Sequence, residues 1–200
     1  MPLPEPAVLA DRLLQIIEAD IVPKTRAGVA AGNKVFGAAI LRKSDLSLVV
    51  AETNAETENP LFHGEVATLN AFYRLSAADR PATRDCLFLS THEPCSLCLS
   101  AITWAGFDNF FYLFGYEDTR DAFNIPHDLK ILQEVFRIEH GDYARENAFW
   151  TSRSIADLVA RAPEAERRRL SARVEALSKI YAGLSATYQA QKGKADIPLD

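Results

Sequence analysis

The chain has 200 residues, a length that fits one domain with room for an appendage. It is 48% hydrophobic and 24% charged, so it can bury a core and is not disordered. The formal net charge of −5 argues against binding to a phosphate backbone, which usually needs a basic surface. We see no membrane-spanning apolar run and no secretory signal, so we expect a cytoplasmic protein.

The first half of the chain alternates between helical and strand-like patterns. Apolar residues at helical spacing predict an amphipathic helix over residues 7–22, followed by a loop at 28–33. A second amphipathic helix is expected over residues 64–76. Short apolar runs bounded by turn residues predict three strands, at residues 35–41, 46–51 and 86–90.

The same alternation continues to residue 138. Pro94 is expected at the first position of a helix that covers residues 95–105. A fourth strand at 110–114, a helix at 127–135 and a short fifth strand at 135–138 complete the pattern. Strands that alternate with helices predict an α/β domain with helices on both faces of one sheet.

The C-terminal part has a helical pattern only. Ser154 and Asp157 match a capping box and predict a helix start. Apolar residues then recur every three or four positions over 170–188, which predicts a long amphipathic helix. This helix must pack either on its own domain or on a second subunit, and residues 193–198 are expected to form a frayed end.

Three residues of the chain have the chemistry of a zinc site: His63, Cys95 and Cys98. Zinc prefers neutral imidazole and thiolate, and a set of three protein ligands leaves one position open for water. Both cysteines fall at the start of a predicted helix, where the helix dipole and the free backbone amides favour the thiolate. Because His63 precedes another helix start, two helix N-termini at one end of a sheet can bring the three groups together.

Glu65 follows His63 by two residues and can face a metal without ligating it. Zinc lowers the pKa of a bound water to about 7, and a carboxylate can accept its proton and pass it to a leaving nitrogen. This placement favours a catalytic site. A structural zinc would need a fourth protein ligand, for which His92 and Cys86 are candidates, and a C-x-x-C pair can also serve redox chemistry.

At these residues the sequence resembles the zinc-dependent cytidine deaminase superfamily, whose signature is H-x-E followed by P-C-x-x-C. The signature is complete here, as HGE at 63–65 and PCSLC at 94–98. The resemblance covers roughly residues 30–130 of the chain and rests on a specific combination of motifs.

The resemblance implies a fold, a cofactor and a catalytic residue. The fold is a three-layer α-β-α sandwich with a mixed five-stranded sheet. The cofactor is one zinc ion per subunit, with a bound water or hydroxide, held by His63, Cys95 and Cys98. Glu65 is the implied catalytic proton shuttle.

Smaller matches to the superfamily imply which residues bind the substrate. Residues 32–38, GNKVFGA, are similar to the entry to the first strand in relatives, which commonly forms one wall of the base pocket. Phe36 and Ala38 are therefore implied substrate-binding residues. Asn54 matches an Asn that reaches the substrate after the second strand in many relatives. His92 replaces a Leu that is frequent in relatives, and we expect it to lie under a loop rather than near the pocket.

Two segments indicate different branches of the superfamily. Gly64 makes the motif H-G-E, which is similar to fungal-type cytosine deaminases. Residues 121–128, DAFNIPHD, are similar to a segment of bacterial guanine deaminases whose closing Asp lies at the base and helps to relay protons. The second match implies Asp128 as a substrate-binding residue, although Asp128 can equally cap the helix that follows.

The resemblance divides the chain into a catalytic domain at residues 1–140 and a C-terminal helical extension at 141–200, which matches no branch. Aromatic residues beyond the sheet often close the pocket in relatives. Residues 147–150, NAFW, can do so here, but we expect them to anchor the tail instead.

Together these features imply a hydrolytic deaminase that converts an amino group on a small nucleobase-like heterocycle to an oxo group and releases ammonia. A guanine-type substrate is favoured, and cytosine, a nucleoside or a nucleotide is the alternative. A tRNA-adenosine editing enzyme fits poorly with the acidic chain, and a non-catalytic zinc-binding module has no need of Glu65. Because relatives are usually dimers or tetramers, we expect a homodimer with no nucleic-acid or membrane partner.

Overall fold

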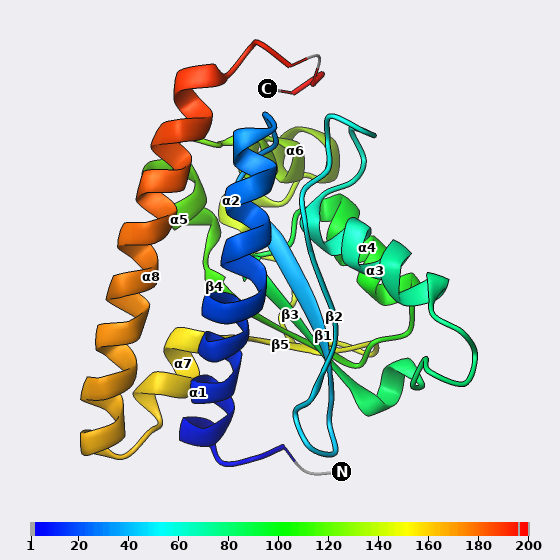
Figure 1. Cartoon of the computed structure of the whole chain (residues 1–200), viewed down its shortest axis with the longest axis vertical. Coiled ribbons are helices and arrows are strands. Elements are labelled where there is room, and N and C mark those ends of the chain that lie inside the picture. Colours follow the sequence, from blue (N-terminus) through cyan, green and yellow to red (C-terminus); the bar gives the residue numbers. More distant parts are fainter. Residues whose placement is uncertain (1–2, 196, 200) are drawn as a thin grey trace.

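A mixed sheet of five strands forms the centre of the molecule. In this computed structural model, which describes residues 3–195 and 197–199, the strand order is β2-β1-β3-β4-β5 (Figure 1). The strands are β1 (Gly37–Arg42), β2 (Leu48–Thr53), β3 (Cys86–His92), β4 (Asn109–Phe114) and β5 (Thr151–Ser154). Strand β1 is antiparallel to β2 and β3, whereas β3, β4 and β5 run parallel. The expected α/β class with a mixed five-stranded sheet is confirmed.

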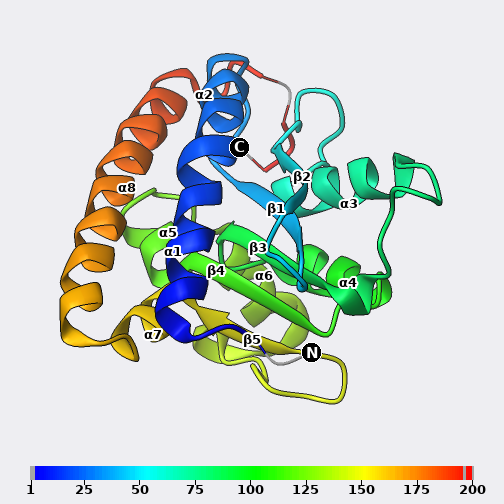
Figure 2. The same cartoon turned by 60° about the horizontal axis from the view of Figure 1, so that its bottom comes forward.

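Helices cover both faces of the sheet and complete the three-layer sandwich (Figures 1 and 2). One layer contains α1 (Pro6–Ile16), the π-helical turn η1 (Ile17–Ile21), α2 (Val22–Ala30), α7 (Ile155–Ala160) and α8 (Glu164–Gln191). The other layer contains α3 (Gly64–Arg74), α4 (Ser96–Trp104) and α6 (His127–Phe136). The connections contain the short helix α5 (Tyr116–Asp121) and the 3-10 turns η2 (Thr83–Asp85) and η3 (Glu139–Gly141).

The alternation of side chains along the strands divides the hydrophobic core in two. On β1, Ala39 and Leu41 join the cluster that packs against α1, η1 and α8, whereas Ala38 and Ile40 join the cluster beneath α3 and α4. All six residues of β4 are buried. Because the sheet is covered on both faces, its central strands are continuous apolar runs, which is why the sequence pattern predicts them.

The N-terminal helical segment is longer than the sequence pattern indicates. Elements α1, η1 and α2 follow one another from Pro6 to Ala30, so the helix covers the start of the loop that was expected at 28–33. The chain turns at Gly32, whose φ of 99° is a conformation that glycine adopts at little steric cost.

The short strand expected at residues 135–138 is wrong. Val135 and Phe136 are the last residues of α6, which ends because Arg137 adopts a left-handed conformation with a φ of 59°. The fifth strand is instead β5, which pairs with β4 from Asn109 opposite Thr151 onward. One strand of the sheet therefore lies in the segment beyond residue 140 that we expected to be a helical extension.

The long C-terminal helix packs on its own domain. Ser154 accepts a hydrogen bond from the backbone N–H of Asp157 at 3.0 Å, so the predicted cap of α7 is confirmed. Helix α8 then runs alongside α1 and α2 (Figure 1), where the Arg173 guanidinium pairs with Asp11 of α1 and Glu18 of η1. Of the two packing modes left open, the intramolecular one is observed. No helix in the described part of the chain is long and apolar enough to cross a membrane.

Candidate zinc and substrate site

Two helix N-termini place the three proposed zinc ligands at one end of the sheet. His63 is the N-cap of α3, and Cys95 is the N-cap of α4, directly after the loop that leaves β3. Cys98 lies one turn into α4 and is fully buried. Pro94 precedes the cap rather than opening the helix, so the expected helix start is displaced by two residues to Ser96.

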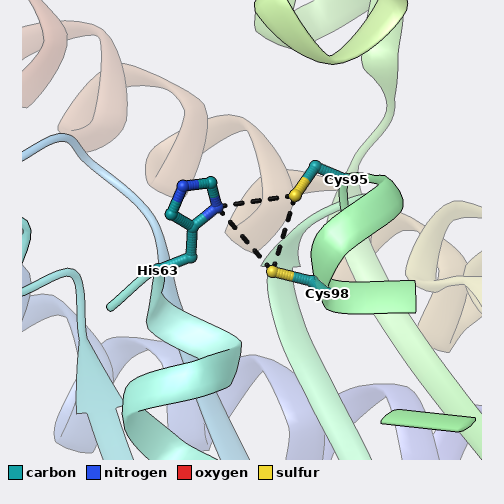
Figure 3. Close-up of side chains that lie close together, drawn as sticks. All are labelled: His63, Cys95 and Cys98. Carbon is teal, nitrogen blue, oxygen red and sulfur yellow. Dashed lines mark hydrogen bonds between the residues drawn. The ribbon is translucent and has the colours of Figure 1, made fainter. Parts of the chain in front are cut away.

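The geometry of these side chains fits a tetrahedral zinc site. The Nδ1 atom of His63 lies 3.5 Å from the sulfur of Cys95 and 3.8 Å from that of Cys98, and the sulfurs are 3.6 Å apart (Figure 3). Zinc–ligand bonds of about 2.0–2.3 Å at tetrahedral angles require separations of roughly 3.5–3.8 Å. The three donors are therefore spaced as zinc would hold them. Within the described residues, this is the one such cluster of His, Cys, Asp or Glu.

The ligand side chains influence one another's protonation strongly. A hydrogen bond from Cys98, opposed by burial, holds the pKa of Cys95 well below its usual value. Burial, followed by the hydrogen bond and charge of Cys95, raises the pKa of the Cys98 thiol well above its usual value. Burial lowers the pKa of His63, but the hydrogen bond and charge of Cys95 outweigh it and raise that pKa to about 9. Zinc binding must displace the remaining protons, because metals bind thiolate and neutral imidazole.

Glu65 lies beside the three ligands and is buried. One of its carboxylate oxygens, Oε1, accepts a hydrogen bond from the Ser90 hydroxyl at 2.7 Å, and the other, Oε2, lies 3.2 Å from the sulfur of Cys98. Burial, and next the charge of Cys95, raise the pKa of the Glu65 carboxyl above its usual value. Because Ser90 fixes one oxygen, the second oxygen faces the metal position and can exchange protons there.

A cavity of about 290 Å³ opens beside His63. Most of its wall is apolar, and these apolar residues include Phe36, Leu61, Leu97, Ile125, Ile131 and Ile197. The polar part of the wall contains Lys34, Glu56, His127 and Asp128. Residues 197–199 line one side, so Ile197 and Pro198, in the segment that we expected to fray, pack against the cavity instead.

Of the four proposed substrate-binding residues, two line this cavity. Phe36 forms part of the apolar wall, and Asp128 lies in the first turn of α6. Pro126 occupies the cap position of α6, and the helix has no side-chain cap, so Asp128 does not cap it. Ala38 belongs to the core beneath α3 and does not line the cavity. Asn54 is buried, and its side chain reaches the lining through its hydrogen bond to Glu56. Burial, and next the charge of Cys95, raise the pKa of Asp128 well above its usual value.

Comparison with known proteins identifies the family. Residues 16–114 match the family model described as the cytidine and deoxycytidylate deaminase zinc-binding region. This part of the chain belongs to that deaminase family. A curated relative, the guanine deaminase of Bacillus subtilis, is 32% identical over 97 residues, which are 48% of this chain and 60% of that protein. The matching region therefore spans less than two thirds of that relative.

Solved structures of 19% identity share the fold. A solved structure of the guanine deaminase from Nitrosomonas europaea has a TM-score of 0.50, with 82% of this chain and 84% of that chain covered. A mutant protein in complex with 8-azaguanine has a TM-score of 0.53, with 94% of this chain and 86% of that chain covered.

Asn54, one of the proposed substrate-binding residues, holds two segments of the chain together by hydrogen bonds. Its side-chain carbonyl accepts a hydrogen bond from the backbone N–H of Gly64 at 2.6 Å, at the start of α3. Its amide donates to Glu56 at 2.8 Å, and Glu56 in turn pairs with the Lys34 ammonium at 2.7 Å. Sequence reasoning missed Lys34 and Glu56, because charged residues in loops look like solvated surface until the fold shows that they are buried.

Gly64 of the deaminase signature is required by packing. A Cβ atom at this position would lie 2.7 Å from the Cα atom of Gly37 and 2.8 Å from its backbone nitrogen. Both neighbouring atoms belong to rigid backbone, so α3 could not keep its present distance from β1 with a larger residue. The glycine is therefore explained by the approach of α3 to β1, independently of any substrate.

Neither candidate for a fourth ligand joins the deaminase zinc site. The ring of His92 is buried among Phe36, Phe114, Phe123 and Tyr181, and its Nδ1 atom lies 2.9 Å from the Thr91 hydroxyl. His92 is therefore buried, as expected, and it also contacts Phe36 of the cavity wall. Cys86 is buried at the start of β3, where its thiol donates to the carbonyl of Ala82.

Of the aromatic residues at 147–150, Trp150 anchors the C-terminal segment, as expected, and neither lines the cavity. Trp150 is buried against Phe110 and Tyr143 beneath the sheet, and its indole N–H donates to the Thr103 hydroxyl at 2.8 Å. Phe149 is 68% exposed. Trp150 therefore anchors the segment before β5 to α4, and the cavity is closed by other residues.

Proposed function

We propose that this chain is a zinc-dependent hydrolytic deaminase, which converts an amino group on a small nucleobase-like heterocycle to an oxo group and releases ammonia. The proposal rests on Glu65, a buried carboxylate that lies beside the three metal donors and outside their cluster. A structural zinc would use a fourth protein ligand and would have no need of such a carboxylate. The family match supports the same chemistry.

The residues of the site have separate roles in the proposed reaction. Zinc on His63, Cys95 and Cys98 would supply an activated water as the nucleophile at neutral pH. Glu65 accepts one proton of that water and delivers it to a ring nitrogen while the oxygen bonds to the ring carbon. It then passes the second proton, from the hydroxyl now on that carbon, to the amino group, which leaves as ammonia while the oxo group forms. Its raised pKa suits this task, because the acid form is then accessible during turnover. Ser90 holds the opposite oxygen and keeps the carboxylate in position.

The size of the cavity favours a free base over a larger substrate. Small-molecule sites usually measure about 300–1,000 Å³, and this cavity, at about 290 Å³, lies at the lower end. The apolar wall with Phe36 suits a flat heteroaromatic ring. Residues 197–199 cover one side of the cavity, which disfavours a nucleotide or an RNA strand.

Among bases, a guanine-type substrate is the better supported. Asp128 lies in the cavity wall, as its match to the bacterial guanine deaminase segment implies. The Bacillus subtilis relative is itself a guanine deaminase. The only feature that favoured cytosine, Gly64, has a packing explanation.

The test is a Glu65→Gln variant of the zinc-loaded protein. It should bind as much zinc as the wild type, measured by elemental analysis, and lose roughly 100-fold or more in kcat for ammonia release. Glu58→Gln, an exposed residue of the preceding loop, is the matched control and should retain activity. Near-normal turnover by Glu65→Gln would refute the mechanism, and no ammonia from guanine, cytosine or their nucleosides with the wild type would refute the function.

A further inference from the structure

The cavity wall contains a buried ion pair that the catalytic chemistry does not use. The Lys34 ammonium lies 2.7 Å from Oε1 of Glu56, and the two side chains are only 7% and 1% exposed. Lys34 precedes β1 and Glu56 follows β2, so the pair joins the two loops at the cavity end of this hairpin. Both residues belong to the cavity lining.

Glu56 is held firmly on its other side. Its second oxygen, Oε2, accepts the backbone N–H of Lys34 at 3.2 Å and the side-chain amide of Asn54 at 2.8 Å. Asn54 is in turn bonded to the start of α3 through Gly64. The Glu56 carboxylate therefore has a fixed position, and so has the ammonium that is paired with it.

The ammonium group of Lys34 can donate more hydrogen bonds than the described residues accept from it. It carries three N–H groups, and among the described residues Glu56 provides its one hydrogen-bond acceptor. Burying a charged group with donors unsatisfied is costly, so such groups are usually bonded to something else, such as water or a ligand. The Lys34 side chain also lines the cavity, so a ligand in the cavity can accept these remaining hydrogen bonds.

We propose that Lys34 is a specificity-determining residue, which donates a hydrogen bond to an oxo oxygen of the substrate. This inference rests on the proposed function and narrows its substrate class to aminated heterocycles that also carry an oxo group. The acceptor is a neutral oxygen rather than an anion, because Lys34 and Glu56 together are neutral and Asp128 is in the same wall. A purely amino-substituted ring would present a donor to the ammonium and be rejected.

The test compares pairs of compounds in which an amino group, with loss of the adjacent ring N–H, replaces the oxo group: guanine with 2,6-diaminopurine, and cytosine with 2,4-diaminopyrimidine. Binding is measured by calorimetry with the zinc-loaded full chain, in a Glu65→Gln background that prevents turnover. Lys34→Met should weaken binding of the preferred oxo compound by about 10- to 100-fold and leave its diamino partner nearly unchanged. Equal effects on both members of a pair, or none on either, would overturn the proposal.

Two further variants separate substrate recognition from folding. Lys24→Met removes an exposed lysine that pairs with Glu52 at 2.9 Å, and it should alter neither affinity. If Lys34→Met misfolds because Glu56 is left unpaired, the double variant Lys34→Met with Glu56→Gln keeps the wall neutral and should show the same selective loss. Failure of all four compounds to bind would also overturn the proposal. Ammonia release without any effect of Lys34 would leave the proposed function intact.

Discussion

At the scale of single residues, close backbone packing explains Gly64, the residue between the two specified positions of the H-x-E motif. Gly64 lies between the ligand His63 and the acid Glu65, and the backbone of Gly37 occupies the space that a side chain at this position would need. The proposed ligand His63 and the proposed proton shuttle Glu65 thus lie at the start of a helix that packs directly against β1. Any substitution at this position tests packing and site geometry together.

We expect Gly64→Ala to lower the free energy of unfolding by about 1–3 kcal/mol, because the added methyl group meets backbone atoms that cannot yield. Urea unfolding of zinc-loaded protein measures this change. The control is Gly183→Ala on the exposed face of α8, where a Cβ meets nothing within 4 Å. There the substitution should stabilise the protein by several tenths of a kcal/mol, because alanine favours the helix. A stabilising effect at Gly64 would contradict the packing explanation.

His92 makes the stability of the protein sensitive to acid. Burial lowers its pKa from 6.5 to about 3, and the only titratable group among the described rings around it is Tyr181 of α8. Below pH 6.5 the unfolded chain binds a proton at this residue and the folded chain does not. Stability from this source is therefore complete above pH 6.5 and is lost progressively as the pH falls toward 3.

We expect His92→Leu to lose less stability than the wild type between pH 7.5 and pH 5, by about 2 kcal/mol. Urea unfolding at the two pH values measures the difference, and zinc content is recorded at each because the metal site is also pH-dependent. The exposed-loop variant Glu58→Gln should follow the wild type. Parallel pH profiles for His92→Leu and the wild type would show that His92 is not the acid-sensitive group.

At the scale of elements, the sequence predicts those strands that are buried, because burial requires apolar residues. Strands β1, β3 and β4 are covered on both faces, so their runs of apolar residues identified them. Strand β5 has the sequence TSRS at the sheet edge, where backbone pairing with β4 is enough to hold it. The pattern instead placed a strand at residues 135–138, of which Val135 and Phe136 form the end of α6.

The same reasoning applies to the site. His63, Glu65, Cys95 and Cys98 could be found because zinc chemistry restricts both residue type and spacing. The residues of the cavity wall could not be predicted from the sequence, because loops and residues 197–199 contribute much of the wall. Residues such as Lys34 become candidates only once the fold shows that they are buried.

At the scale of the whole molecule, the two helical layers differ in their outer surfaces. In layer α1–α2–α8, ion pairs join neighbouring helices, such as those of Arg173 on α8 with Asp11 and Glu18. Layer α3–α4–α6 exposes large apolar side chains, which are Tyr73, Leu97, Trp104, Val135 and Phe136. Trp104 alone is 91% exposed. Exposed apolar groups of this size mark interaction surfaces in soluble proteins.

We propose that this layer forms the interface of the expected homodimer. Light scattering coupled to gel filtration should give twice the chain mass of 22.1 kDa for the wild type and one chain mass for Trp104→Glu. Val8→Glu, on α1 of the opposite layer and 56% exposed, should remain dimeric. A monomeric wild type, or a dimeric Trp104→Glu, would exclude this interface.

The packing of residues 197–199 against the cavity has a practical consequence for anyone who prepares this protein. A purification tag fused after residue 200 would begin two residues beyond Leu199 of the cavity lining, where it can obstruct entry or displace Ile197. Helix α1 begins at the opposite end of the molecule (Figure 1). A tag at residue 1 is therefore the better choice for binding and activity measurements. A comparison of the two tagged forms would show whether residues 197–199 control access to the cavity.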